Sequence, residues 1–397
     1  MATYFANVTV FDGHRLRPRA GVLVSNGTIS WVGSHVRAPR DARAAAEVQG
    51  KDQTLGPGLL DCHVHLSFDG TADFSGEARD LTEARAAVKA VRNAMRHLRS
   101  GVTTVRDLGG PGASMCEVAR AMEQGLAEGA RVLPAGQALT VTGGHGRGLF
   151  AVEVDGPEGL RKAIRTQVSA GALAIKVIAT GGVLTPGIKV DVTAYTLEEL
   201  EAAVDEAHKW DLPVAAHAHG AAGITNAVQA GVDSIEHGSQ ITADTARLMK
   251  ERGTFHVPTI SALAAIVEHA DEVEPHVIEK GREIAEQARD AFHRALRAGV
   301  RHACGTDAGT PFNPHGATPH EIVKMVEWGL PPLRAMEAAT ANAAELLRAP
   351  DIGTVEEGKA ADLVIWPGDP VEEIDAVLKP AMVMQAGDRV YDGAATL

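Results

Sequence analysis

Cysteine is scarce in this sequence of 397 residues. The three cysteines are odd in number and lack CxxC spacing, so neither a disulfide framework nor an all-cysteine zinc site is indicated. Apolar runs of about 18 residues are also missing, and residues 1–20 contain no apolar segment followed by a cleavage site. These absences argue against membrane-spanning and secreted classes, and we expect a soluble cytoplasmic protein.

Runs of lysine or arginine are absent as well. The chain has 38 basic and 51 acidic residues, which gives a net charge of −13. This charge argues against nucleic acid or an anionic membrane as the main partner, so a small-molecule substrate is the better expectation. A hydrophobic content of 45% with only 4% aromatic residues is typical of a globular α/β protein packed with aliphatic side chains.

Both ends of the chain have the pattern of β structure. In the first segment β-rich runs alternate with turns, and Asn26-Gly27 between two apolar runs is typical of a hairpin. The last segment repeats the pattern around Gly387-Asp388. Neither segment is long enough to bury a core alone. We therefore predict that residues 1–56 and 352–397 pair into one small β-sandwich domain.

Helical and apolar stretches alternate through residues 57–351. Glycine ends the helical stretches and an apolar run follows at once, which is the pattern of a helix C-cap entering a strand. Eight successive strand–helix units predict a (β/α)8 barrel. An open doubly wound sheet is the alternative, but no GxGxxG motif follows an early strand. The eight strands are predicted near residues 59–65, 102–107, 131–140, 173–180, 213–219, 232–238, 254–260 and 301–307.

The first predicted strand ends in Asp61-Cys62-His63-Val64-His65. Because side chains alternate along a strand, His63 and His65 project to the same side, where two imidazoles can chelate one ion. Such an HxH motif is weak alone, since two polar residues at a strand end are the simpler explanation.

The fourth predicted strand contains a lysine, Lys176, within an apolar run. An uncompensated charge there would be expensive to bury. One explanation is an ion pair with a neighbouring carboxylate. The other is that burial keeps the amine neutral, so that it adds carbon dioxide and becomes a carbamate, an anionic ligand able to bridge two metals.

Three further strands end in candidate metal ligands. His217 and His219 end the fifth strand, His237 ends the sixth, and Asp307 ends the eighth. Neutral imidazole suits zinc, and barrel enzymes build their active sites at the C-terminal ends of the strands. The shared location of ligands on five strands predicts a metal site at this end of the barrel.

These residues resemble those of the amidohydrolase superfamily. The resemblance rests on Gly56–His65, Lys176, the pair His217 and His237, and Gly305-Thr306-Asp307, and it extends to Gly353–Leu363. Three longer motifs resemble the subgroup of Xaa-Pro dipeptidase-like enzymes and ochratoxin amidases: Val141–Gly146, Ala216–Gly220 and Gly305–Pro311.

The resemblance implies two zinc ions or similar divalent metal ions. Imidazolonepropionases and nucleobase deaminases share much of the pattern but are mononuclear and lack the bridging lysine, so Lys176 favours two metals. Phosphotriesterase-like relatives match the subgroup motifs less well. The implied ligands are His63 and His65 for the more buried ion, His217 and His237 for the more exposed ion, Lys176 as a bridging N6-carboxylysine, and Asp307 on the first ion.

Two histidines remain at the same rim. The resemblance implies that His145 and His219 contact the substrate carboxylate or the developing oxyanion. For His219 the alternative is a hydrogen bond that orients a metal ligand. Arg147 is another candidate for binding an anion, although surface arginines are usually only solvated.

The implied activity is hydrolysis of an amide bond in dipeptides, such as Xaa-Pro, or in N-acyl amino acids. Two cations would lower the pKa of a bridging water toward about 7 and supply the attacking hydroxide. Asp307 would take the proton and deliver it to the leaving nitrogen, or it would serve only as a ligand. The alternative substrates are aryl amides, carbamates or ureas. The alternative of another class is a non-catalytic interaction protein that retains the barrel. Relatives often assemble, so a homo-oligomer is expected.

Other polar features of the helices and loops receive no role in the site. The loop Pro311–Gly316 either contributes to the substrate pocket or only turns the chain. Histidines in polar helical stretches are predicted to be solvated: His97, His208, His269, His276 and His293.

Overall fold

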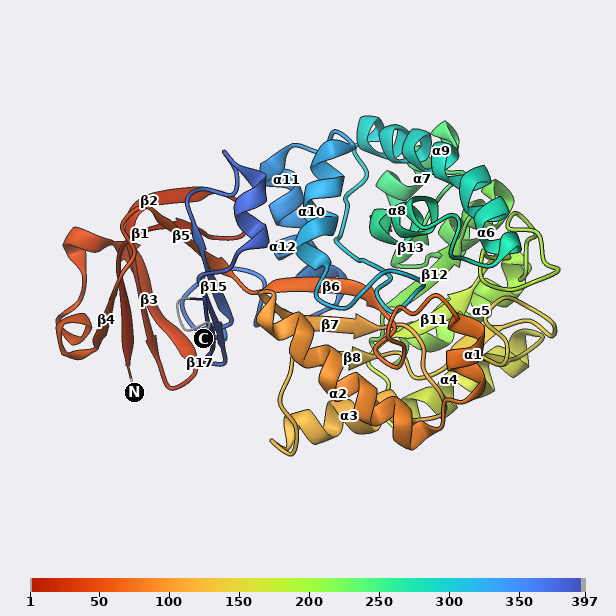
Figure 1. The fold of residues 1–397 in the computed structure, drawn as a ribbon, viewed down its shortest axis with the longest axis horizontal. Helices are drawn as coiled ribbons and strands as arrows, with labels where there is room; N and C mark the ends of the chain where they lie inside the picture. The colour runs from red at the N-terminus through yellow and green to blue at the C-terminus, as the bar shows by residue number, and fades with distance from the viewer. Residues whose placement is uncertain (1, 394–397) are drawn as a thin grey trace.

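The computed structural model describes residues 2–393, and in it strands from the two ends of the chain meet in one mixed β-sheet (Figure 1). The strand order is β17-β16-β15-β5-β1-β2-β3, with β4 beside β1. Short 3-10 helices flank the sheet: η1 (His35–Arg37), η2 (Arg40–Ala44) and η3 (Ile374–Leu378). The strands are β1 (Thr3–Phe11), β2 (Leu16–Ser25), β3 (Thr28–Ser34), β4 (Ala46–Gln49), β5 (Gln53–Pro57), β15 (Leu363–Pro367), β16 (Met382–Gln385) and β17 (Asp388–Asp392).

Two features explain how the termini combine into this domain. Asn26 and Gly27 adopt φ values of 50° and 79°, so the turn between β2 and β3 has the left-handed geometry that an Asn-Gly hairpin favours. The prediction of a hairpin there is confirmed. β5 and β15 pair antiparallel, with Gly56 opposite Val364, and this pairing joins the N-terminal and C-terminal strands. Their inward side chains bury one shared apolar core.

The middle of the chain is a barrel of parallel strands with helices outside it, as predicted (Figure 1). The predicted strand 131–140 is divided into two, because Gly136 between them adopts a φ of 70°. β10 (Ala151–Glu153) adds to the rim beside β9. The barrel strands are β6 (Leu59–Val64), β7 (Val102–Asp107), β8 (Arg131–Pro134), β9 (Ala138–Thr140), β11 (Ile175–Ile178), β12 (Val214–Ala218), β13 (Ser234–His237) and β14 (Phe255–Val257).

The eighth predicted strand, residues 301–307, is irregular but closes the barrel. On one side the backbone N–H of Ala303 donates to the carbonyl of His256. On the other side the N–H of Cys62 donates to the carbonyl of Cys304, and the N–H of Asp307 donates to the carbonyl of His63. These bonds link the segment to both β14 and β6, so Asp307 comes to lie directly beside the HxH motif.

Helices cover the outside of the barrel and connect its strands. Gly171, Gly231, Gly253 and Gly299 end helices in the left-handed conformation, as the sequence predicts. The helices are α1 (Phe74–Arg79), α2 (Glu83–Arg99), α3 (Ser114–Glu123), α4 (Pro157–Ala170), α5 (Leu197–His208), α6 (Ala221–Ala230), α7 (Ala243–Arg252), α8 (Ile260–Glu268), α9 (Pro275–Ala298), α10 (Thr318–Glu327), α11 (Pro332–Ala338) and α12 (Ala341–Leu346).

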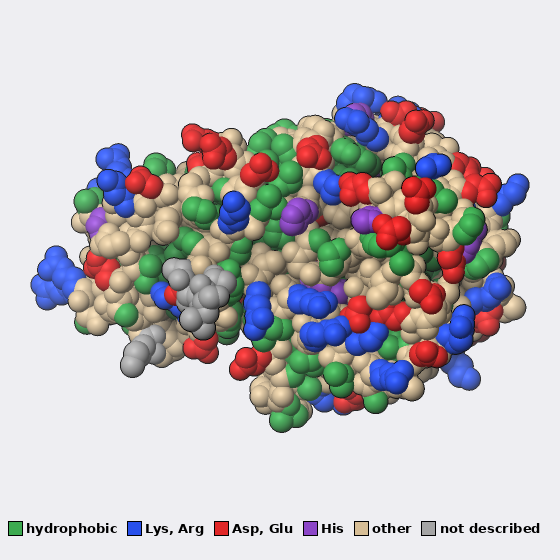
Figure 2. Space-filling model, viewed as in Figure 1, with side chains coloured by type: hydrophobic (Ala, Val, Ile, Leu, Met, Phe, Trp, Pro, Cys, Tyr) green, Lys and Arg blue, Asp and Glu red, His purple; other side chains and the backbone are tan. Residues whose placement is uncertain are grey.

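The surface is that of a protein with mixed charge. On the face drawn in Figure 2, acidic and basic side chains are interspersed over both the barrel and the β domain. Among residues 2–393, every helix is too short or too polar to cross a membrane.

The prediction that His97 is solvated is wrong. Its side chain is completely buried, and its Nε2 donates to His315 Nδ1 at 3.0 Å. The helical period explains the burial, because Ala86, Ala90 and Asn93 precede it at intervals that place all four on the inward face of α2. Of the other helical histidines, one is exposed, His208, and three are half-buried: His269, His276 and His293.

Candidate metal centre

The predicted ligands converge at the mouth of the barrel. Although they come from five different strand ends, all of them line one pocket of about 560 Å³, a volume that includes the solvent at its opening. Each of these side chains is buried. The converging residues are His63, His65, His145, Lys176, His217, His219, His237 and Asp307.

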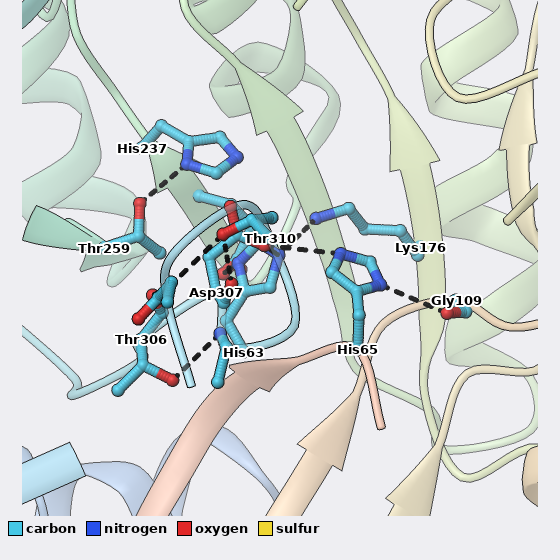
Figure 3. A network of polar contacts seen from close by, with 12 residues as sticks. His63, His65, Gly109, Lys176, His237, Thr259, Thr306, Asp307 and Thr310 are labelled. Carbon is cyan, nitrogen blue, oxygen red and sulfur yellow. Dashed lines mark hydrogen bonds and ion pairs between the residues drawn. The ribbon is translucent and has the colours of Figure 1, made fainter. Parts of the chain in front are cut away.

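Their donor atoms form two groups. In the first, Asp307 Oδ1 lies 3.3 Å from His63 Nε2 and 3.4 Å from His65 Nε2 (Figure 3). The second consists of His217, His219 and His237, and within each group the donors lie within 4.8 Å of one another. The sequence had paired only two of these three histidines, and the structure adds His219 to the same group.

Lys176 lies beside the first group. Its side chain extends from β11 into the pocket, and its Nζ is 3.4 Å from His63 Nε2 (Figure 3). Burial lowers the pKa of Lys176 to about 8, against the opposing effect of the nearby Glu236 and Asp307 carboxylates. At this pKa about a tenth of the amine is neutral at pH 7, far more than for an exposed lysine.

Hydrogen bonds fix the rings of the first group. His63 Nδ1 donates to Glu236 Oε2 at 2.9 Å, and His65 Nδ1 donates to the carbonyl of Gly109 at 3.1 Å. Each ring therefore leaves its Nε2 lone pair facing Asp307. Such outer partners set both the tautomer and the orientation of a metal-binding histidine.

Hydrogen bonds also orient the rings of the second group, although His217 uses a different ring nitrogen from the other two. His217 Nε2–H donates a hydrogen bond to the carbonyl of Gly181 at 3.0 Å, which leaves the lone pair of Nδ1 available to a metal ion. His237 and His219 use Nδ1 instead, and contact the hydroxyls of Thr259 at 2.7 Å and Ser239 at 2.8 Å. Both of these rings leave Nε2 free.

Five imidazoles of the site are neutral near pH 7: those of His63, His145, His217, His219 and His237. Burial lowers the pKa of His63 to about 4 and the pKa values of His145 and His219 to about 3. Burial and neighbouring histidines hold the pKa values of His217 and His237 well below the usual range. Neutral imidazole is the form that binds a metal ion.

Asp307 supplies the negative charge. Burial opposes its ionisation, but the neighbouring His63 and His65 still lower the pKa of this carboxyl below its ordinary value. With neutral imidazoles, fixed tautomers and an ionised carboxylate, the two groups of residues fit divalent metal ions that accept nitrogen and oxygen ligands.

Two buried charges behind the first group were missed by the sequence reasoning. Glu236 Oε1 is 3.0 Å from Arg106 Nη2, and both side chains are fully buried. Burial raises the pKa of Glu236, but Arg106 and His63 outweigh it and lower the value to about 2. The available signal was a charged residue inside an apolar strand, the same signal that singled out Lys176.

Asp61, which the sequence shows only as part of a motif, joins the two ligand-bearing segments. One of its oxygens accepts hydrogen bonds from the backbone N–H groups of His63 and Thr306, both at 3.1 Å. The other accepts from the hydroxyls of Thr306 and Thr318 at 2.8 and 2.7 Å. The carboxylate thus ties β6 to the segment that carries Asp307.

Backbone strain gathers at the same end of the barrel. His237, Thr259 and Asp307 adopt φ values of 68°, 50° and 58°, in the left-handed region that residues other than glycine rarely occupy. Residues held in this way concentrate at functional sites, where the surrounding structure keeps them in place.

The outer wall of the pocket is apolar, and Arg147 is not part of it. Its side chain is exposed and contacts the carbonyl of Gly143, so it does not converge with His145. The loop Pro311–Gly316 also stays outside the lining, although Thr310 before it belongs to the wall. The apolar lining residues are Phe150, Ile178, Val183, Leu184, Ala262, Leu263 and Ile266.

Comparisons with known proteins agree with this geometry. Residues 54–390 match the amidohydrolase family. The chain is 33% identical to ochratoxinase from Aspergillus niger over 416 aligned positions, which cover 96% of this chain and 84% of the relative. The solved structure of a Xaa-Pro dipeptidase with methionine bound in its active site has a TM-score of 0.90 and 32% identity, over 98% of this chain and 99% of that one.

A second solved structure, a prolidase complexed with N-methylphosphonate-L-proline, has a TM-score of 0.90 and 31% identity over 98% and 99% of the two chains. The match to the family covers most of the chain, and the two buried groups of donors lie at the C-terminal end of the barrel, where barrel enzymes build their active sites. The chain therefore belongs to the amidohydrolase family and is a metal-dependent amidohydrolase.

Proposed function

We propose that this enzyme hydrolyses the amide bond of dipeptides, Xaa-Pro or similar, or of N-acyl amino acids. The observation that carries the proposal is that two metal-ligand groups and the β11 residue Lys176 line one pocket. The proposed ions are two Zn²⁺, one held by His63, His65 and Asp307, and the other by His217 and His237. When bound, such ions polarise a carbonyl and make water acidic enough to attack it near neutral pH.

Lys176 is proposed to act as N6-carboxylysine and to contribute a ligand to both ions. Its neutral Nζ would form a bond to the carbon of carbon dioxide and lose a proton, which yields an anionic carbamate. Two properties of the chain support this role: the lysine is buried at 1% exposure, and burial brings its pKa down to about 8. The resulting anion would also remove the cost of burying a cation there.

Asp307 is proposed to move the proton. Its ionised carboxylate can accept a proton from the attacking water and then donate it to the leaving nitrogen, which would otherwise depart as a prohibitively basic anion. Its burial and its position beside His63 and His65 keep the group ionised and close to the reacting atoms.

Substrate binding is assigned to two neutral histidines and the apolar wall. His219 and His145 line the pocket, and if Nδ1 of each ring accepts from its hydroxyl partner, Ser239 or Thr185, its Nε2–H can donate to a substrate oxygen. The apolar wall favours a substrate with an apolar side chain next to the scissile bond. A methionine is bound in the related dipeptidase and a proline analogue in the related prolidase, and both ligands have an apolar side chain.

The second candidate is hydrolysis of uncharged aryl amides, carbamates or ureas. One feature favours it: among residues 2–393, the side chains that line the pocket include no arginine, and Lys176 is the single lysine among them. A substrate carboxylate would thus meet neutral imidazoles where a dedicated cation is usual.

A screen of the zinc-loaded protein separates the two candidates. Dipeptides, N-acyl amino acids, aryl carbamates and aryl ureas are incubated together, and the products are identified by mass spectrometry. Asp307→Asn protein serves as the control for contaminating hydrolases. Cleavage confined to substrates with a free carboxylate supports the dipeptidase proposal, and cleavage only of the uncharged aryl substrates replaces it with the second candidate.

A further inference from the structure

The helix α8, which forms part of the pocket wall, begins in an unusual way. Thr259 is its N-cap residue, and a threonine there normally accepts a hydrogen bond from a backbone N–H in the first turn. Thr259 makes no such bond. Its hydroxyl instead lies 2.7 Å from His237 Nδ1 (Figure 3). It also lies 2.8 Å from the carbonyl of Pro258.

These two contacts define the proton positions. A hydroxyl has one hydrogen, and the Pro258 carbonyl can only accept, so Thr259 donates to it. The same oxygen must then accept from His237, which places the ring proton on Nδ1. The Nε2 lone pair of His237 is thereby left for a ligand within the second group.

Thr259 needs support to stay in this position. Its backbone has φ 50° and ψ 47°, a left-handed conformation that is unfavourable for a β-branched residue. Because its hydroxyl is occupied, the first N–H groups of α8 would also be left without acceptors in a buried region.

Glu321 supplies the missing cap from a different helix. This fully buried carboxylate on α10 accepts from the N–H of Ile260 at 2.8 Å and from the N–H of Ser261 at 2.7 Å. The negative charge also lies at the positive end of the helix dipole. Burial opposes this charge and raises the pKa of Glu321 to about 7, whereas the hydrogen bonds from Ile260 and Ser261 favour the ionised form.

We propose that Glu321 is a positioning residue for the metal centre. It caps α8 in place of Thr259, which holds Thr259 in its left-handed conformation and frees the threonine hydroxyl to fix the tautomer and orientation of His237. This inference rests on the proposed role of His237 as a metal ligand.

The test measures metal binding by the metal-free full-length protein, without any substrate. Zinc is titrated in competition with a chromophoric chelator, and melting temperatures are recorded for the metal-free proteins. Thr259→Val keeps the shape but removes the hydroxyl, and Glu321→Gln weakens the cap. Each is expected to weaken the affinity for one of the two ions by about 10- to 100-fold, as loss of an outer partner of a metal ligand usually does. The affinity for the other ion is expected to stay unchanged. Thr259→Ser is expected to bind both ions like the wild type.

Two further variants give the comparison. Thr242→Val removes the hydroxyl that caps α7 through the N–H of Thr245, away from the pocket. It is expected to lower the melting temperature without changing either zinc affinity. The double variant Thr259→Val/Glu321→Gln is expected to lose no more affinity than Thr259→Val alone, because both residues act through one contact.

The outcomes are distinguishable. If His237→Ala retains both ions, the proposed ligand set is wrong, and the positioning role of Glu321 is overturned with it. If His237→Ala loses one ion but Thr259→Val binds both normally, the ligand set stands and only the positioning role of Thr259 and Glu321 is overturned. If Glu321→Gln does not fold, Glu321→Asp, which shortens the reach to the two N–H groups, takes its place. Unchanged zinc affinity in the Glu321 variant that folds, or additive losses in the double variant, also overturns the proposal.

Discussion

Glu236 accepts a hydrogen bond from His63 Nδ1 at 2.9 Å, and its other oxygen pairs with Arg106 at 3.0 Å. The contact joins β13 to β6, and Arg106 extends it to β7. Since Glu236 is ionised, His63 must carry its proton on Nδ1 and present Nε2 to the pocket. The charge of a residue that touches neither metal nor substrate thus decides how a proposed ligand is presented.

Glu236→Gln is expected to weaken the ion at His63 by about 10- to 100-fold, because an amide holds the ring less well than a carboxylate. It should also cost about 3–5 kcal/mol of unfolding free energy, since Arg106 is left buried without its partner. Zinc titration and urea unfolding measure the two effects. The control is Glu117→Gln, which breaks an exposed pair with Arg120 and should change neither quantity. Wild-type zinc affinity in Glu236→Gln would contradict the role assigned to it.

Asp307→Asn should retain zinc but lose turnover. An amide can still contact a metal, but it cannot accept a proton and return it, so kcat is expected to fall by about 100- to 10,000-fold. Metal content by elemental analysis and kcat on the best substrate of the screen are the two measurements. Normal turnover with full metal content would leave Asp307 as a ligand only.

Lys176→Ala should lose both metal and activity, because it removes the proposed anionic bridge. A short carboxylic acid such as acetate or propionate, supplied at high concentration, should restore part of each by occupying the vacated space. Metal content and activity are measured with and without the acid, and chloride at equal ionic strength is the control. Full activity of the variant without any added acid would rule out the carbamate.

Acid should destabilise the metal-free protein through its buried histidines. His315 accepts from His97 and donates to the carbonyl of Phe68, and burial lowers its pKa from about 6.5 when unfolded to about 4. Between these values the unfolded chain binds a proton that the folded chain does not, so stability is complete above pH 6.5 and is lost as the pH falls toward 4. The shift at this one residue corresponds to about 3 kcal/mol of unfolding free energy, which is lost at low pH.

Urea unfolding at several pH values tests this expectation. In His315→Gln the dependence on pH between 6.5 and 4 should be shallower than in the wild type, whatever the stability at pH 7. His14→Gln, which changes an exposed histidine, should keep the wild-type slope. An unchanged slope in His315→Gln would show that His315 is protonated in the folded chain.

The sequence was sufficient for the parts of the site that follow from strand geometry. His63 and His65 alternate on one strand, and His217, His237 and Asp307 lie at or near the ends of three others, so a barrel had to bring them to one end. Lys176 lies within β11, and the apolar run around it was its signal. The homo-oligomer and the cytoplasmic location stay predictions, because no feature of a single chain bears on them.

What the sequence did not reveal depends on contacts between distant segments. Glu236 lies 173 positions from His63, and Glu321 lies 61 positions from Ile260. No local pattern connects such pairs. The strain at Thr259 was hidden for a related reason. Residues 254–260 are predicted as one strand, whereas β14 ends at Val257 and α8 begins at Ile260, and only the position of His237 shows how the Thr259 hydroxyl is used.

The apolar wall of the pocket is expected to select the substrate side chain. Leu263 is 5% exposed and lines the pocket from α8, whereas Val267 on the same helix is 40% exposed and lies outside the lining. Leu263→Arg should lower kcat/KM for substrates with apolar side chains by more than about tenfold, because even one methylene in an apolar pocket is worth about 1–3 kcal/mol. It should at the same time improve the relative rate with acidic side chains. Val267→Arg adds the same charge to the same helix and should leave both rates unchanged. Equal effects of the two substitutions would mean that general charge near the pocket, and not the apolar wall, determines which side chain is accepted.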